Sequence, residues 1–424
     1  MGIWINKRYA PTLICGAFSL VRGSVVILKK GRYRYNGFYE NWKSVKLGNF
    51  VDVNPKSFLP RKFKYVDLES VVGTKLISFR EEIRESAPSR AQRVAQKGDV
   101  FFQTVRPYQK NNYLFDLNED NYVFSTGYAQ LRSKVDSAFL LARLQEEGFV
   151  NKVIERCTGT SYPAINSKDL SRISITIPEH FEEQSAIGTL FRTLDDLLAS
   201  YKDNLTNYQS LKATMLSKMF PKAGQTVPEI RLDGFEGEWE LIKLGEVCDL
   251  ITKGTTAKSQ SEQGKVNFIK VENLKDNEIY SVVKISEEEH LGSLKRSILF
   301  EGDILFSIAG TLGRTAIVRN NVLPANTNQA LAIIRGYKLD AYFLLVVLSG
   351  EVVKDYIRKN PTVGAQPNLS LEQVSSLKIQ APSIEEQRAI GLYFSNLDNL
   401  INSYQEKISQ LETLKKKLLQ DMFI

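Results

Sequence analysis

Two groups of polar residues could do chemistry with a polyanion. In the first half of the chain they are Arg106, Lys110, Asn112, Thr160 and Tyr162; in the second half they are Lys253, Thr255, Arg314, Asn328, Gln366 and Asn368. Arginine and lysine bind phosphate oxygens, and Arg, Asn and Gln hydrogen-bond the edges of bases. The two groups predict a nucleic-acid-binding surface, and the same composition is also typical of ordinary solvated loops.

The sequence contains none of the common catalytic or cofactor-binding patterns. Its only histidines, His180 and His290, do not provide a histidine triad or a two-histidine metal motif. There is no phosphate-binding loop, no dinucleotide fingerprint, and no Asn-Pro-Pro-aromatic run of the kind used by amino-methyltransferases. Asp99 and Asp303 each follow a glycine and are interpreted as turn residues. We therefore expect no catalytic residue, no metal and no bound cofactor.

Composition is that of a globular protein with a mild excess of positive charge. The chain has 424 residues, 43% of them hydrophobic, and a net charge of +8. This length predicts two or more domains, and the basicity suits a polyanion, a ribosome or a membrane surface. Cys15, Cys157 and Cys248 are too far apart to indicate a disulfide framework, so we expect a cytoplasmic protein. Tyr9–Leu28 is interrupted by Arg22 and does not read as a membrane span.

One long stretch of the chain occurs twice. Glu182–Phe220 and Glu385–Phe423 align without a gap, and neither contains proline, so each is predicted to form one continuous helix. At 1.5 Å per residue each helix would be roughly 58 Å long, which is unusual for a surface helix of a compact domain.

Alternating steps of four and three residues along both stretches give an apolar stripe. Its members are Ile187, Phe191, Leu194, Leu198, Tyr201, Leu205, Ile390, Phe394, Leu397, Ile401, Tyr404 and Ile408. This is the spacing of a coiled-coil seam, and a lysine interrupts it at the same place in each copy, Lys212 and Lys415. The shared polar break predicts a fixed register. Each helix could instead pack against an unrelated partner, but the repeat makes the two helices natural partners of each other.

The part of the chain before each long helix is also duplicated. The matching segments are Gly37–Trp42 with Gly234–Trp239, Tyr65–Glu69 with Phe268–Glu272, Gly98–Phe102 with Gly302–Phe306, Phe139–Leu144 with Tyr342–Leu348, and Ile173–Ile177 with Leu377–Ile379. The first pair opens each repeat. The second and last pairs are predicted strands, the third is a turn into a buried strand, and the fourth is a helix.

We therefore predict a mixed α/β (α+β) fold with two similar globules and two long helices related by a pseudo-two-fold axis. The predicted segments are an N-terminal extension of uncertain structure (1–30), the first globular domain (31–181), the central helix (182–220), a linker (221–234), the second globular domain (235–382) and the C-terminal helix (383–424). The helices are expected to be antiparallel, because the linker is too short to run back along a helix of roughly 58 Å.

This arrangement resembles the specificity subunit of type I restriction–modification enzymes. The resemblance covers about residues 31–424, and the order of its motifs, given twice, is what makes it specific. The motifs are Gly37-Phe38 to Trp42 and Lys46-Leu47-Gly48, Gly234-Phe235 to Trp239 and Lys243-Leu244-Gly245, Gly364–Ser370, and Pro382–Gln387. The first copy has Tyr162-Pro163-Ala164 where the second has Gln366-Pro367-Asn368.

The resemblance implies a non-catalytic reader of double-stranded DNA with two target recognition domains. Each domain would read one half of a bipartite site, and the helices would set the spacer and dock two methyltransferase subunits. Those subunits would bring S-adenosylmethionine and modify adenine N6. A motor–nuclease (restriction) subunit would add cleavage with ATP and Mg²⁺.

A second class of function remains open at this stage. The chain could be a non-enzymatic coiled-coil adaptor that presents two globular protein-binding domains. Salt-dependent DNA binding separates the two hypotheses, because phosphate contacts release counterions.

Overall fold

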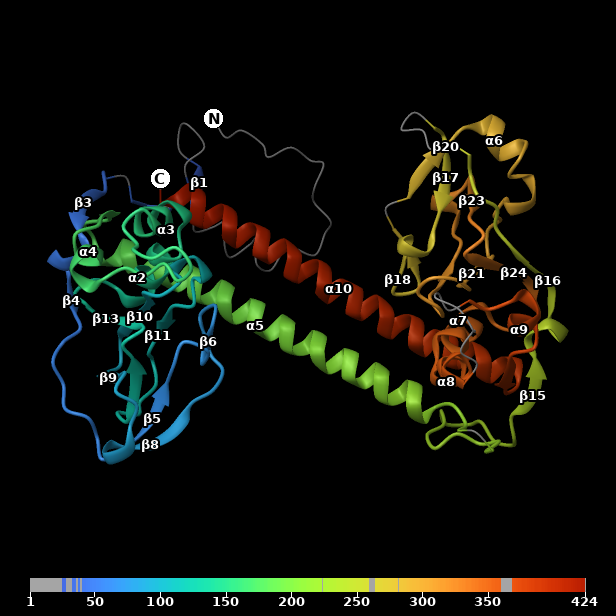
Figure 1. The fold of residues 1–424 in the computed structure, drawn as a ribbon, viewed down its shortest axis with the longest axis horizontal. Coiled ribbons are helices and arrows are strands. Elements are labelled where there is room, and N and C mark those ends of the chain that lie inside the picture. Colours follow the sequence, from blue (N-terminus) through green and yellow to red (C-terminus); the bar gives the residue numbers. More distant parts are fainter. Residues whose placement is uncertain are drawn as a thin grey trace. The chain divides into compact units, whose positions relative to one another are not determined.

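The computed structural model describes residues 25–27, 33–35, 37, 38, 40–222, 224–258, 264–280, 282–359 and 368–423. The chain divides into two compact units: unit 1 is Met1–Lys202 with Lys407–Ile424, and unit 2 is Asp203–Glu406. Each unit contains one globular repeat and part of both long helices (Figure 1). The predicted mixed α/β fold with two similar globules and two long helices is confirmed.

Two four-stranded sheets form the centre of unit 1. One has the order β11-β10-β13-β4 and is antiparallel; the other has the order β8-β5-β12-β9, with β5 and β12 parallel. The strands of the unit are β1 (Val25–Ile27), β2 (Tyr33–Tyr35), β3 (Lys43–Lys46), β4 (Val51–Val53), β5 (Lys62–Val66), β6 (Val71–Val72), β7 (Lys75–Leu76), β8 (Arg80–Ile83), β9 (Ala91–Val94), β10 (Asp99–Gln103), β11 (Tyr113–Leu114), β12 (Tyr122–Ser125), β13 (Tyr128–Ser133) and β14 (Ser174–Ile177). Its short helices are α2 (Ser137–Leu144), α3 (Glu147–Ile154) and α4 (Ser167–Ser171).

Strand β10 connects the two halves of the core of unit 1. Successive side chains of a strand point to opposite faces, and β10 is buried on both. Phe101 stacks on Phe124 of the second sheet with ring centroids 3.6 Å apart, whereas Phe102 packs against Phe149 of α3. This explains why the sequence after Gly98 is apolar without alternation.

Unit 2 repeats this plan. A four-stranded sheet has the order β16-β24-β21-β22, and a three-stranded sheet has the order β20-β17-β23, with β17 and β23 parallel. The strands are β15 (Glu240–Lys243), β16 (Cys248–Lys253), β17 (Val266–Ile269), β18 (Leu274–Lys275), β19 (Glu278–Ile279), β20 (Val283–Ile285), β21 (Ile304–Ser307), β22 (Thr315–Ile317), β23 (Ala325–Thr327), β24 (Leu331–Tyr337) and β25 (Lys378–Ala381). The short helices are α6 (Glu287–Leu291), α7 (Ala341–Ser349), α8 (Glu351–Lys359) and α9 (Leu371–Ser375).

The first pair of predicted strands is shifted toward the C-terminus relative to the structure. The sequence predicted strands at Tyr65–Glu69 and Phe268–Glu272, but β5 ends at Val66 and β17 ends at Ile269. In unit 1 the strand ends because the Asp67 carboxylate accepts a hydrogen bond from the Glu69 amide at 3.1 Å, which turns the chain. The other predicted strands and the two predicted helices agree with β10, β14, β21, β25, α2 and α7.

The two long helices are α5 (Phe181–Lys218) and α10 (Ile384–Met422), and the sequence repeat predicted both. Within unit 1, Phe191 of α5 stacks on Phe423, and Lys202 pairs with Glu412 at 2.6 Å. Residue numbers therefore rise along one helix as they fall along the other, and the helices are antiparallel. Within unit 2 the same direction follows from two contacts: the Tyr208 ring stacks on that of Tyr404 at 5.5 Å, and Lys212 pairs with Asp398.

The predicted seam is buried over most of its length. Ile187, Phe191, Leu194 and Leu198 of α5 are buried, and so are Ile390, Phe394, Leu397, Ile401 and Ile408 of α10. Tyr201, Leu205 and Tyr404 are half-buried. The coiled-coil interpretation of the stripe is confirmed.

Each globule also binds the end of the helix that belongs to the other repeat. In unit 1 the Phe423 ring lies 5.8 Å, centroid to centroid, from the rings of Trp42, Phe139 and Phe191. In unit 2 the repeat-related Phe220 makes the same set of contacts, with Trp239, Phe343 and Phe394. This reciprocal packing explains why tryptophan and terminal phenylalanine occur in both repeats.

The lysines that interrupt the seam each pair with an aspartate of the opposite helix. Lys415 pairs with Asp195 within unit 1, and Lys212 pairs with the repeat-related Asp398 within unit 2. These groups are partly buried, with between 19% and 27% of each side chain exposed. A slip of the helices would separate both pairs, so the polar break specifies the register, as the sequence predicted.

We expect Lys415→Asp to lower the stability of the protein by about 1–2 kcal/mol, because it places two carboxylates opposite each other in a partly buried seam. Combining Lys415→Asp with Asp195→Lys should recover most of the loss. Denaturant unfolding followed by circular dichroism measures both. Lys416→Asp, at an exposed position of the same helix, is the matched control. A double variant no more stable than Lys415→Asp alone would contradict the pairing.

Candidate nucleic-acid interface

The first candidate surface lies where two loops of unit 1 meet. One loop, Val105–Asn112, follows β10; the other, Thr158–Ala164, precedes α4. The loops are joined because the Arg106 amide donates to the Pro163 carbonyl at 2.8 Å. The guanidinium carbon of Arg106 lies 4.3 Å from the centroid of the Tyr162 ring. A stacked guanidinium keeps its N–H groups in the plane of its edge, where they can bind phosphate or guanine.

The other predicted residues of this surface differ in accessibility. Thr160 is exposed beside Tyr162. Lys110 pairs with Glu147 at 2.6 Å, which offsets its charge. Asn112 is buried, and its amide oxygen accepts a hydrogen bond from the Gln103 backbone at 2.8 Å. Asn112 therefore braces the loop from inside, and we remove it from the set of proposed DNA contacts.

Tyr108 is a further exposed residue of this surface. It lies on the short turn Pro107–Gln109 and is 51% exposed. Its neighbour Arg106 has the left-handed backbone conformation, with φ of 53°. This conformation is uncommon for residues other than glycine. Here it turns the loop so that Arg106 faces Tyr162.

In unit 2 a cluster forms at the C-terminal ends of parallel strands β17 and β23. Thr255 donates its amide to the Thr327 carbonyl at 2.9 Å, and the Asn328 amide donates to Ile269 at 3.4 Å. Between Lys253 and Thr255, a Cβ on Gly254 would lie 2.2 Å from the Thr327 and Asn328 carbonyl oxygens. Only glycine permits this close approach. The structure therefore brings Lys253, Thr255 and Asn328 together.

Arg314 and Asn368 belong to a second loop cluster of unit 2. Arg314 donates to the carbonyls of Val271 and Leu274 at 3.2 and 3.3 Å, so it supports the chain after β17. Asn368 forms a backbone bridge with Ala309, in the loop that follows β21. This bridge is the counterpart of the one between Val105 and Ala164 in unit 1. Gln366 lies outside the described residues.

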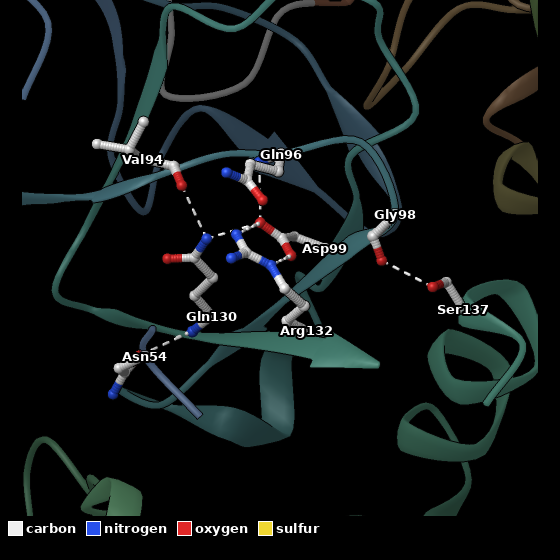
Figure 2. A network of polar contacts seen from close by, with 8 residues as sticks. All are labelled: Asn54, Val94, Gln96, Gly98, Asp99, Gln130, Arg132 and Ser137. Atoms are coloured by element: carbon white, nitrogen blue, oxygen red, sulfur yellow. Dashed lines mark hydrogen bonds and ion pairs between the residues drawn. The ribbon is translucent and has the colours of Figure 1, made fainter. Parts of the chain in front are cut away.

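Both units contain the same ion pair, with a buried aspartate, directly before or at the start of a central strand. Figure 2 shows Asp99 of unit 1, which accepts two hydrogen bonds from Arg132 at 2.9 Å and one from the Gln96 amide at 2.8 Å. In unit 2, Asp303 accepts from Arg335 at 2.7 and 2.6 Å and from the Phe300 amide at 2.8 Å. Asp99 and Asp303 are therefore turn residues, as predicted. The hydrogen bonds to Asp99 also raise the pKa of Arg132.

A second buried pair was missed by the sequence analysis. Arg34 binds the Glu183 carboxylate at 2.8 and 3.1 Å, and Arg231 binds Glu386 at 2.8 and 2.7 Å. Both glutamates lie in the first turn of a long helix, where a carboxylate also stabilises the helix dipole. The signal was present in the sequence, since each arginine is the first residue of an Arg-x-Asn/Asp-Gly-Phe run.

Acidic, histidine and cysteine side chains are dispersed over the described residues. No group of three or more His, Cys, Asp or Glu side chains in the described ranges is placed to hold a metal ion. Burial raises the pKa of both described cysteines, that of Cys248 to about 11, so their thiols are protonated at neutral pH. Among the described helices, none is long and apolar enough to cross a membrane.

Comparison with known proteins identifies the family. A model of the type I restriction modification DNA specificity domain matches twice, at residues 39–207 and 236–413. The MjaVIII specificity subunit of Methanocaldococcus jannaschii is 23% identical over 403 residues, covering 90% of this chain and 91% of the relative. The HindI specificity subunit of Haemophilus influenzae is 22% identical, covering 84% and 90%.

Solved structures share the fold. The S subunit of a type I restriction–modification system from M. genitalium aligns with a TM-score of 0.62 at 16% identity, covering 92% of this chain and 97% of that one. A chain from a type I R-M system studied for complex assembly and conformational transition aligns with a TM-score of 0.51 at 24% identity, covering 90% and 98%. Two matched domains, each ending in one of the long helices, make this chain a member of the type I restriction–modification DNA specificity family, and hence a specificity subunit.

Proposed function

We propose that each unit reads one half of a bipartite site in double-stranded DNA. The observation that carries this proposal is a shared framework with different loops. The ion pairs of Asp99 and Asp303 are repeated in detail, but the loops of the two units differ. In the loop after β10, Arg106 of unit 1 stacks on Tyr162, whereas in the equivalent loop after β21, Arg314 of unit 2 binds the carbonyls of Val271 and Leu274. Unit 2 instead presents Lys253, Thr255 and Asn328 at the ends of β17 and β23. Because sequence is read by side chains that reach base edges, different loops on one scaffold read different sequences.

The long helices have two roles in this proposal. They set the number of unspecified base pairs between the half-sites, and they dock two methyltransferase subunits. Register control by the Asp195–Lys415 and Asp398–Lys212 pairs supports the first role, since a ruler must not slip. The exposed faces of α5 and α10 outside the seam supply surface for the second.

The chemistry is assigned to the partner subunits. The methyltransferase subunits bring S-adenosylmethionine and modify adenine N6, and a restriction subunit adds ATP- and Mg²⁺-dependent translocation and cleavage. The chain itself binds DNA without catalysing a reaction, in the cytoplasm.

DNA binding with a steep salt dependence tests the proposal against the adaptor hypothesis. For four neutralised phosphates, the affinity of the complex with methyltransferase subunits should fall by about 100-fold between 50 and 200 mM salt. Fluorescence anisotropy with a labelled duplex measures this. If the complex does not bind DNA, or if its affinity for DNA does not change with salt concentration, the adaptor hypothesis is favoured.

A further inference from the structure

The loop between β4 and β5 in unit 1 carries an unusually exposed aromatic residue. Phe58 is 98% exposed, and no other large apolar side chain in the described part of the chain exceeds 67%. Single exposed apolar residues are common on protein surfaces and need no explanation by themselves. Phe58 differs because its loop is held at both ends and is basic.

The N-terminal end of the loop is fixed by Asn54. Its backbone amide donates to the Gln130 carbonyl at 2.8 Å, and its side-chain oxygen accepts from the Gln130 amide at 2.9 Å. Its side-chain nitrogen donates to the Ser167 hydroxyl at 2.7 Å. Ser167 begins α4, the helix that follows the Thr158–Ala164 loop of the candidate interface. The loop is therefore tied to the segment that carries Tyr162.

The C-terminal end is fixed directly after Phe58. The Leu59 side chain packs against a small core of Phe63, Tyr65, Ala91 and Val123. Arg84 donates a side-chain hydrogen bond to the Leu59 carbonyl, and its amide donates to the Arg61 carbonyl at 3.0 Å. With Leu59 turned inward and held, Phe58 is directed outward. Two prolines, Pro55 and Pro60, further restrict the backbone.

The charge of the loop indicates what Phe58 meets. Residues 54–66 contain Lys56, Arg61, Lys62 and Lys64 and no acidic residue. Lys64 pairs with Glu119, but none of Lys56, Arg61 and Lys62 forms an ion pair with a described residue, and all three are exposed. The neighbouring strand β8 carries Glu81 and Glu82, so the uniform positive charge is confined to the loop and strand β5.

A single aromatic ring among lysines and arginines suits nucleic acid better than protein. The cores of protein interfaces are depleted in lysine and bury contiguous apolar surface. DNA offers phosphates for the cations and the π-face of a base for the ring, and apolar side chains that enter a base step unstack it. The corresponding part of unit 2, residues 254–265, contains no aromatic residue.

We propose that Phe58 stacks on a base of the half-site read by unit 1 and opens a base step there, while Lys56, Arg61 and Lys62 bind the flanking phosphates. This inference rests on the proposed function. It assigns to unit 1 a readout of DNA deformability that the loop of unit 2 lacks.

The test uses the complex of the chain with its methyltransferase subunits and a duplex carrying the bipartite target found by methylation mapping. 2-Aminopurine is placed at successive positions of the unit 1 half-site, and permanganate probes its thymines. Binding of the wild-type complex should raise the fluorescence at one position or expose one thymine. Phe58→Ala should abolish this signal and weaken binding by about 5- to 150-fold, the range measured for base–aromatic stacking.

Phe58→Trp should restore the signal, because a larger ring stacks as well. Leu241→Ala, at another exposed apolar position, should leave signal and affinity unchanged. Since Phe58 is exposed, the thermal midpoint of Phe58→Ala should equal that of the wild type.

The outcomes separate the two proposals. If the wild-type complex binds its target but Phe58→Ala leaves affinity and base stacking unchanged, the role of Phe58 is wrong and the DNA-reading function stands. If Phe58→Ala prevents assembly with the methyltransferase subunits, Phe58 is a protein contact, which also overturns the inference. If the wild-type complex does not bind DNA, the proposed function itself fails.

Discussion

Exchange of residues 235–380 for the matching segment of a relative is expected to change one half of the methylated sequence and to leave the other half intact. The segment contains the Lys253, Thr255 and Asn328 cluster together with Arg314 and Asn368. The segment begins shortly before β15 and ends within β25, and these two strands pair with each other. The exchange therefore replaces both strands of that sheet almost completely. The exchanged unit should therefore fold around its own framework.

The reciprocal exchange, of residues 38–177, is the matched control. It should change the other half-site and leave untouched the half altered by the first exchange. Methylation mapping of both chimaeric complexes measures the two results. A change of both halves by one exchange would show that the units do not read separately.

Insertion of four residues in α5 between Tyr201 and Leu205 is expected to lengthen the spacer without changing either half-site. Four residues extend a helix by roughly 6 Å, which corresponds to between one and two steps of about 3.4 Å along DNA. They also complete slightly more than one turn, so the apolar stripe stays within about 40° of its original face. The apolar stripe can therefore still face α10, but α5 is now longer than α10 and cannot keep both the Asp195–Lys415 and the Asp398–Lys212 pair. A matching insertion of four residues in α10, between Tyr404 and Ile408, restores both pairs and is made together with the first.

The same four residues inserted in the linker, between Lys222 and Pro228, serve as the control for this experiment. The linker lies outside both long helices, so the spacer should not change. Methylation mapping of the two insertion variants compares the motifs directly. An active complex with the original spacer after insertion in α5 and α10, or with altered half-sites, would show that the helices are not the ruler.

The long helices could be predicted because their signal is local and is given twice. A stripe with seven-residue periodicity fixes which side chains are buried. Lys212 and Lys415 interrupt the stripe at the same place in both copies, so the sequence alone indicated a polar contact there; the structure adds the partners, Asp398 and Asp195. Turn residues were predictable for the same reason. The interactions of Asp99 begin with an amide only three residues away.

The strand ends and the candidate site were less predictable. The strand that contains Tyr65 ends before the predicted residue, because the Asp67 side chain accepts a hydrogen bond from a backbone amide that a longer strand would use for pairing. A pattern of apolar residues does not reveal this hydrogen bond. Asn112 could not be separated from exposed amides, because its burial and its hydrogen bond from the Gln103 amide exist only in the folded chain. The stacking of Arg106 on Tyr162 joins residues far apart in the chain. Phe58 stands out only once its exposure is known.

Methylation mapping of DNA exposed to the intact wild-type complex tests the central claim most directly. The chain would be purified with methyltransferase subunits, supplied with S-adenosylmethionine, and the modified adenines located by sequencing. Because the two units share a framework but differ in their loops, we predict one asymmetric methylated motif. It should consist of two specified halves separated by a spacer of fixed length. Methylation without sequence preference, or at one continuous motif, would contradict the account.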